Sequence, residues 1–251
     1  MKRKMHKTFL TTLLLLVLQV KAQNTRTETY LLEKTSVSLQ LTEYGKEPQK
    51  VVYLNLHENE TTSVLAAKDY LSTKNGYLIA VKQSGNRNLT FTQKGMKFQF
   101  DPNRMFTKPG RISTLKLLNK KYLDAAEETV EEFSDKIISR IRNARLVVAL
   151  HNNTNGKPLS ANSYKNRYIN PAMDADDFIL TTEKSIYEQL KAKKINTVWE
   201  TTSTSIDDGS LAYYCSQKNI PYVNVEAQHG HRSQQLKLLN ALTSIINQYT
   251  K

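Results

Sequence analysis

KVVYLNLHENETTSVLAAKDYL, residues 50–71, contains the transition that decides the fold. Residues 50–56 form a nearly continuous β-rich run, and residues 61–71 repeat apolar side chains with the spacing of a helix. A strand followed at once by a helix is the repeating unit of α/β proteins. The polar stretch HENE at 57–60 therefore lies at the carboxyl end of a predicted strand.

The same alternation of strand-like and helical runs continues along the chain. Because strands separated by helices favour parallel pairing, we predict an α/β fold with a mainly parallel or mixed central sheet and helices on both faces. A polar surface loop is expected from 151 to 177, and an acidic cluster at Glu127, Glu128, Glu131 and Glu132 is expected to form a solvated helix face. The further predicted strands are 36–41, 77–81, 145–150, 177–182, 196–202 and 222–227, with a hairpin at 89–100, and the predicted helices are 113–142 (one helix or two), 183–194, 211–218 and the C-terminal stretch.

The N-terminus has the pattern of an export signal. Residues 1–22 combine a basic start, an apolar run of 12 residues from Phe9 to Val20, and small residues before Gln23. That run is shorter than the roughly 20 residues that span a bilayer, so we expect cleavage after Ala22 and no stable membrane insertion. The prediction is a periplasmic or secreted protein whose residues 23–251 form one catalytic domain.

Removal of the signal changes the charge. The chain has 36 basic and 23 acidic residues, and five of the basic ones lie within residues 1–22, so the net charge falls from +13 to +8. The remaining basic residues are spread along the chain, without the aromatic alternation of a strand-binding groove, and we expect no nucleic-acid partner. The single cysteine, Cys215, excludes an internal disulfide and is expected to be a buried structural thiol.

The four histidines outside the signal all follow predicted strands. They are His57, His151, His229 and His231. His57 and Glu60 have the spacing H-x-x-E at a strand-to-helix junction, where both side chains can turn toward one point. With His151 as a third ligand, they would make a catalytic zinc site with one position open for water. Alone, H-x-x-E also fits a hydrogen-bonded strand-end histidine.

Three further segments place the motif in a known family context. DPNRMF at 101–106 resembles a segment of zinc carboxypeptidases and of the aspartoacylase and succinylglutamate desuccinylase group. HENE at 57–60 and LHNNT at 150–154 are similar to two segments of the latter group, and a late strand ends in Glu226. The four signatures occur in family order over residues 50 to 230. The resemblance implies a zinc carboxypeptidase-like, phosphorylase/hydrolase-like architecture.

The same resemblance implies a role for each matching residue. Zn²⁺ would be held by His57, Glu60 and His151, with Glu226 as the general base. Asn103 and Arg104 would grip a substrate carboxylate or stabilise the oxyanion, since arginine offers a planar bidentate partner. Arg87 is the candidate for a second substrate-binding arginine, with a surface loop residue as the alternative.

Several residues depart from the family pattern. Ala149 stands where the aspartoacylase group has an aspartate, so a partner that orients a zinc ligand is absent or supplied elsewhere. Pro102 stands where the family usually has a leucine before the Asn-Arg pair. His229 and His231 have no counterpart; they are candidate accessory residues or part of a solvated turn. The substrate-gating tyrosine of carboxypeptidases could be Tyr213, Tyr214 or Tyr222.

The predicted function is an exported zinc-dependent amide hydrolase. Its substrate would be a small peptide C-terminus or an N-acyl amino acid with a free carboxylate, cleaved by zinc-activated water and Glu226. The residues of the HENE, NRMF and LHNN motifs favour an N-acyl amino acid deacylase, whereas export favours peptide substrates. The alternative is a non-catalytic periplasmic binding module that retains the fold. The sequence leaves the oligomeric state open.

Overall fold

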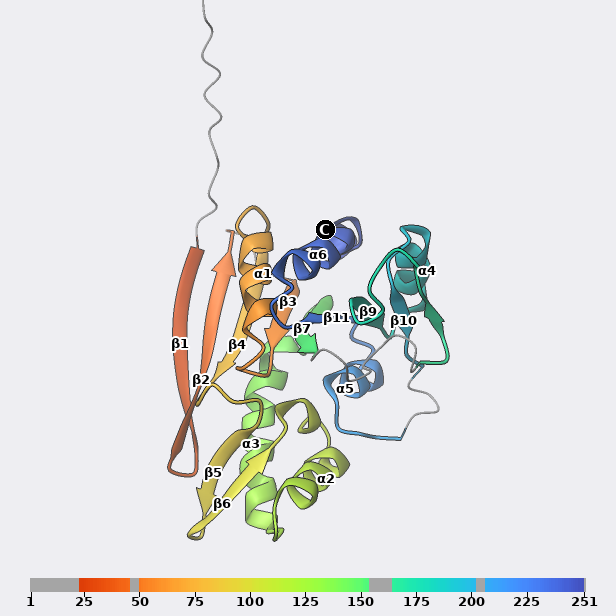
Figure 1. Ribbon diagram of the computed structural model, residues 1–251. Coiled ribbons are helices and arrows are strands. Elements are labelled where there is room, and N and C mark those ends of the chain that lie inside the picture. The colour runs from red at the N-terminus through yellow and green to blue at the C-terminus, as the bar shows by residue number, and fades with distance from the viewer. Residues whose placement is uncertain (1–22, 46–49, 154–163, 202–205, 251) are drawn as a thin grey trace, which may run out of the picture.

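The computed structural model describes residues 23–45, 50–153, 164–201 and 206–250 (Figure 1). The predicted signal segment, residues 1–22, lies outside the described residues, as do residues 154–163 of the loop expected at 151–177.

Strands and helices alternate along most of the described chain. The strands are β1 (Gln23–Leu32), β2 (Thr35–Tyr44), β3 (Val51–Asn55), β4 (Gly76–Lys82), β5 (Leu89–Gln93), β6 (Met96–Phe100), β7 (Leu146–Asn153), β8 (Arg167–Tyr168), β9 (Phe178–Thr181), β10 (Thr197–Trp199) and β11 (Tyr222–Gln228). The helices are α1 (Thr61–Leu71), the 3₁₀ helix η1 (Pro102–Arg104), α2 (Lys108–Leu118), α3 (Asp124–Ile141), α4 (Lys184–Ala192), α5 (Leu211–Gln217) and α6 (Arg232–Tyr249).

One large mixed sheet organises these elements. Its strand order is β1-β2-β4-β3-β7-β11-β9-β10-β8, and β5 and β6 form a separate hairpin. The central strands β4, β3, β7 and β11 pair in parallel, whereas β2 joins β4 and β9 joins β11 in antiparallel fashion. The predicted α/β class with a mixed sheet is therefore confirmed. Because the central strands are parallel, their carboxyl ends meet at one edge, where the site is built.

The two faces of the sheet carry different helices. Val147 and Ala149 of β7 pack into the cluster that contains α3 and α5, whereas Leu146, Val148 and Leu150 pack into the cluster that contains α1, α4 and α6. Figure 1 shows α1 and α6 lying close together over one face. By the same period-two alternation, His151 lies on the side of β7 that carries Val147 and Ala149, which is the α3/α5 side.

The predicted helical region 113–142 consists of two helices. α2 begins after Thr107, whose hydroxyl accepts a hydrogen bond from Gly110 N, and the chain between α2 and α3 is extended at Asn119. The expected solvated acidic face is wrong for Glu127. Its carboxylate is buried and lies 2.5 Å from Nε of Arg111, which also pairs with Glu131. A buried arginine needs such a partner, and the sequence pattern gave no sign of one.

Two strands were missed by the sequence analysis. β1 has polar residues on both faces and is largely exposed, so it carries no apolar alternation; it pairs with β2 through Gln23↔Tyr44 to Leu32↔Thr35. β8, which lies in the predicted loop 151–177, has two residues and adds to the edge of the sheet beside β10. Both lie at sheet edges, where fewer side chains need to be apolar.

Two further observations bear on what the chain can be. Within the described ranges, no helix has the length and apolar character that a membrane crossing requires. Cys215 in α5 is fully buried, and this burial raises the pKa of its thiol, as expected for a structural cysteine.

Candidate metal centre and surrounding cavity

Three potential metal ligands converge at the carboxyl ends of β3 and β7. His57 follows β3, and Glu60 N donates to His57 O at 3.0 Å, which turns the carboxylate back toward the imidazole. His151 lies on β7 beside them. One ligand atom from each of the three residues lies within 4.8 Å of the other two, and all three side chains are buried.

The donor set of this cluster fits a cation. Nδ1 of His57 lies 2.9 Å from Glu60 Oε1, Nδ1 of His151 lies 2.9 Å from Glu60 Oε2, and the two Nδ1 atoms are 3.2 Å apart. Two imidazole lone pairs and a carboxylate repel one another unless a proton or a metal ion lies between them. Two histidines and a glutamate are also a ligand set that zinc uses in hydrolases.

Burial and charge shift the pKa values of the cluster in opposite directions. Burial alone would raise the pKa of Glu60, but the neighbouring His151 and His57 outweigh it and hold that pKa well below its usual range. Burial alone would lower the pKa of His57, but Glu60 and Asp101 raise it to about 9. The cluster therefore stabilises charge of both signs in a site removed from water.

Asp101 orients the first histidine. Its Oδ1 lies 2.7 Å from Nε2 of His57, on the side of the ring opposite the other ligands. Ligating histidines commonly hold their second nitrogen against a carboxylate in this way. Asp101 thus supplies an orienting carboxylate for His57, whereas Nε2 of His151, on the strand that carries Ala149, is buried and has no hydrogen-bond partner in the described part of the chain. Asp101 belongs to the DPNRMF motif at 101–106, but no role was predicted for it.

Glu226 lies on β11, directly beside His151 in the parallel register. Tyr222, Asn224 and Glu226 alternate with apolar residues that pack on the opposite face, so all three point to the α3/α5 side. Asn224 Nδ2 donates to Glu226 Oε1 at 3.0 Å, while the buried Oε2 has no hydrogen-bond partner within the described part of the chain. Burial, with a further contribution from Glu60, raises the pKa of Glu226 despite the nearby His151. A carboxylate held in this way can accept and return a proton.

The two arginines predicted to bind substrate both line the cavity. Arg87 Nη1 lies 2.7 Å from Glu60 Oε1, and its Nη2 lies 3.3 Å from Asp101 Oδ2. Arg104 Nη1 lies 2.9 Å from Asp208 Oδ2. Arg87 thus contacts the ligand cluster through Glu60 and Asp101, whereas Arg104 pairs with Asp208.

Asn103 has a contact that the sequence analysis did not foresee. Its Oδ1 accepts from Leu211 N at 3.1 Å and so fixes the start of α5. Gly209 allows the segment before α5 to lie this close to η1, because its φ is +74° and a Cβ at this position would lie 2.4 Å from Arg104 O. The tight packing keeps Asp208 beside Arg104.

These side chains enclose one small cavity of about 120 Å³. Of the tyrosines considered for substrate gating, only Tyr222 lines it. Glu200, Asp208 and Tyr164 were not identified from the sequence. Glu200 directly follows β10, which ends at Trp199. Because polar residues at strand ends mark the candidate site, Glu200 would have been included if the predicted strand had ended at Trp199 instead of at residue 202. The lining residues are Glu60, Arg87, Asn103, Arg104, His151, Asn152, Tyr164, Leu180, Glu200, Asp208, Ser210, Ala212, Tyr222, Asn224 and Glu226.

The two candidate accessory histidines lie elsewhere. His229 and His231 are exposed in the turn between β11 and α6, and neither lines the cavity. Their backbone nitrogens bond to Asn153 O and Gln228 O at 3.1 Å and 3.0 Å. The structure therefore places them in the solvated turn that was the alternative interpretation.

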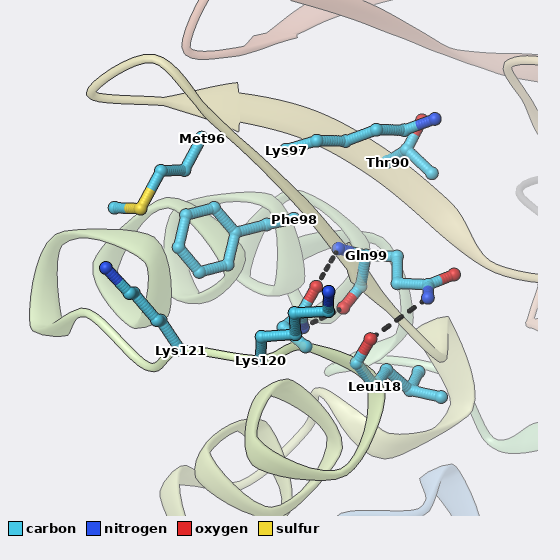
Figure 2. A pocket seen from close by; sticks show the side chains of 9 residues that line it. Thr90, Met96, Lys97, Phe98, Gln99, Leu118, Lys120 and Lys121 are labelled. Carbon is cyan, nitrogen blue, oxygen red and sulfur yellow. Dashed lines mark hydrogen bonds between the residues drawn. The ribbon is translucent and has the colours of Figure 1, made fainter.

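A larger hollow of about 520 Å³ lies away from these residues, between β6 and the end of α2 (Figure 2). Met96, Phe98 and Leu118 line it, with lysines beside them, and Nε2 of Gln99 donates to Leu118 O at the end of α2 at 3.0 Å. It contains none of the candidate ligands or the candidate base. Size alone therefore does not mark the functional site in this protein.

Comparison by sequence finds no matching family model and no matching curated protein. Solved structures do match. The ectoine utilization protein EutE (DoeB) from Ruegeria pomeroyi is 14% identical with a TM-score of 0.50, covering 92% of this chain and 68% of that chain. Thrombin activatable fibrinolysis inhibitor (TAFI) is 10% identical with a TM-score of 0.53, covering 91% of this chain and 70% of that one. This chain thus has the fold of the zinc carboxypeptidase-like superfamily.

Proposed function

We propose that the protein is an exported zinc-dependent amide hydrolase that acts on a peptide C-terminus or an N-acyl amino acid with a free carboxylate. One observation carries the proposal: His57, Glu60 and His151 converge beside the buried carboxylate of Glu226, one oxygen of which has no partner among the described residues. The fold is compatible with this chemistry, but the proposal rests on the side chains.

The three ligands would hold Zn²⁺, which at such a site lowers the pKa of water toward about 7 and polarises a carbonyl group. Asp101 would keep the His57 ring in the orientation that presents Nδ1 to the ion. Oε2 of Glu226 would take the proton of the attacking water and return it to the leaving nitrogen, while Asn224 holds Oε1 in place. Burial of these groups excludes bulk water from the proton transfer.

Arg104 would bind the substrate carboxylate. Asp208 uses its Nη1, and among the described residues no partner occupies its Nη2 or Nε. A guanidinium with free donors on one edge can grip a carboxylate through two parallel hydrogen bonds. Arg87 is held by Glu60 and Asp101, and it would contribute positive charge near the scissile carbonyl.

The test is a mass-spectrometric screen of zinc-loaded protein against peptides and N-acyl amino acids, with a C-terminal carboxamide analogue matched to each substrate. We expect zinc-dependent amide hydrolysis of carboxylate substrates and much slower cleavage of the carboxamides. Protein that binds stoichiometric zinc yet cleaves no member of the panel would reject the enzyme and favour the binding module.

The export proposal rests on the sequence of residues 1–22 alone. N-terminal sequencing of protein recovered from cell fractions tests it. We expect a mature chain beginning at Gln23 outside the cytoplasm, whereas a cytoplasmic chain that retains residues 1–22 would contradict the proposal.

A further inference from the structure

The part of the cavity formed by Arg104, Glu200 and Asp208, here called the outer end, carries more negative than positive charge. Arg104 pairs with Asp208 at 2.9 Å, which leaves the carboxylate of Glu200. Within the described ranges, no cation forms a salt bridge with Glu200. Burial raises the pKa of this carboxyl group, Asp208 raises it further, and Arg104 offsets only part of the effect. Two carboxylates, of Glu200 and Asp208, and one guanidinium, of Arg104, thus share this space.

The neighbouring tyrosines do not supply the missing positive charge. Tyr164 lies near Glu200, Glu226 and Arg104, and burial, with those carboxylates, raises its pKa to about 12. Its hydroxyl is therefore neutral. Tyr222 is also buried, and its pKa is likewise raised. Both rings add apolar surface beside the acids rather than charge.

Asn224, which lines the same cavity, offers a further hydrogen-bond acceptor. Oδ1 of Asn224 is buried and has no partner among the described atoms, while Nδ2 of the same amide donates to Glu226. Buried acceptors without a donor are uncommon in folded proteins, and they suit a ligand that brings donors. An ammonium group brings three donors and no acceptor.

A bound substrate would add to the excess of negative charge at the outer end. If its carboxylate binds Arg104, as in the proposed function, the outer end would hold three carboxylates and one guanidinium. Like charges in a partly desolvated site repel one another strongly. A second group of positive charge on the substrate would restore the balance and satisfy the acceptors.

We therefore propose that the amino acid released by hydrolysis carries a cationic side chain, such as the amine of lysine or a related diamino acid, that binds Glu200 and Asp208. The inference rests on the proposed function for the carboxylate on Arg104, and it adds the substrate class. It applies to both a peptide C-terminus and an N-acyl amino acid, since both release the amino acid that bears the carboxylate.

The binding experiment titrates zinc-loaded protein with L-lysine, L-norleucine and Nε-acetyl-L-lysine, followed by NMR. Norleucine lacks only the amine, and the acetylated compound keeps the chain without the charge. We expect lysine to bind at least about tenfold more tightly than either neutral compound, as for one charge-assisted hydrogen-bonded contact. Equal affinities, or no detectable binding of lysine, would overturn the inference.

Two variants connect the preference to these residues. Glu200→Gln and Asp208→Asn each remove one charge and keep the shape, and an asparagine at 208 can still accept the bond that Asp208 Oδ1 receives from Ser210 N. Each should lower the ratio of lysine to norleucine affinity at least threefold, and Glu188→Gln, an exposed acid on α4, should leave it unchanged. Circular dichroism checks the fold of each variant. Ratios unchanged in both folded variants would overturn the inference.

Hydrolysis of benzoylglycyl-L-lysine and benzoylglycyl-L-norleucine separates the two proposals. Faster cleavage of the lysine substrate, with a ratio that depends on Glu200, supports both. If neither substrate is cleaved but lysine still binds preferentially, the hydrolase is rejected and the cation site stands. If both are cleaved at equal rates, the hydrolase stands and the cation site is rejected.

Discussion

The two ends of the cavity are built on different principles. At the inner end, Glu60 and His151 line the cavity and both contact His57, and the side chains of His57, Glu60 and His151 are 0%, 2% and 5% exposed. At the outer end, the side chains of Arg104 and Asp208 are 42% and 48% exposed. The inner end is fixed by strand ends and by mutual contacts, whereas the outer end is formed by Arg104 at the end of η1 and by Glu200 and Asp208 between β10 and α5. A rigid, buried cluster suits chemistry, and a more open, charged region suits the choice of substrate.

Glu226→Gln should have the largest effect on catalysis, the role assigned to the inner end. The change keeps the size of the side chain and the hydrogen bond with Asn224 but removes the proton acceptor. We expect kcat to fall by ~10²–10⁴-fold, the usual contribution of a general base, while zinc content stays the same. Steady-state kinetics and metal analysis of one preparation measure both. Undiminished kcat would exclude Glu226 as the base.

Asp101→Asn should weaken the inner end without unfolding it. An asparagine can still accept the bond from Asn103 N but no longer offers a charged partner to Nε2 of His57. Loss of such an orienting carboxylate typically lowers metal affinity by about 10–100-fold. Competition with a chelator measures the affinity. Asp69→Asn, which affects a surface pair with Arg232, is the control and should bind zinc as the unaltered protein does.

Arg104→Lys should affect binding more than turnover. Lysine keeps the charge but cannot form two parallel bonds to a carboxylate. We expect KM for carboxylate substrates to rise by roughly tenfold, consistent with the loss of one hydrogen bond to a charged group, with a smaller change in kcat. Substrates that end in a carboxamide serve as the internal control, and their slow cleavage should not change. An equal loss for both substrate types would show that Arg104 does not recognise the carboxylate.

His229→Ala and His231→Ala should have the smallest effect. Both side chains are exposed and outside the cavity, and exposed substitutions usually change stability by less than about 0.5 kcal/mol. Zinc affinity and kcat/KM are expected to remain at the level of the unaltered protein. A large loss of either quantity would bring this turn into the site and remove the contrast between the two ends.

The inner end could be predicted from the sequence because its residues directly follow strong strand signals. His57, His151 and Glu226 each follow or end an apolar run, and parallel neighbours bring such ends together. Asp101 lies in a motif whose spacing was recognised, but no local pattern shows that its carboxylate reaches His57, 44 positions earlier.

The outer end was not predicted. Glu200 was assigned to the interior of a strand that in fact ends at Trp199, and Asp208 lies in a polar segment without periodicity. The place of Asp208 beside Arg104 depends on the close approach of Gly209 to Arg104 O at the end of η1, a contact between positions about a hundred apart in the sequence. The strand β1 was missed for a related reason, since an exposed edge strand leaves no apolar pattern.

The central claim is that His57, Glu60 and His151 together hold one zinc ion. Calorimetric titration of metal-free protein with Zn²⁺, combined with metal analysis after dialysis, tests it most directly. We predict one tightly bound zinc per chain in the unaltered protein and loss of that binding in Glu60→Ala and in His151→Ala. Unaltered protein that binds no zinc, or folded variants that bind it as tightly as before, would contradict the account.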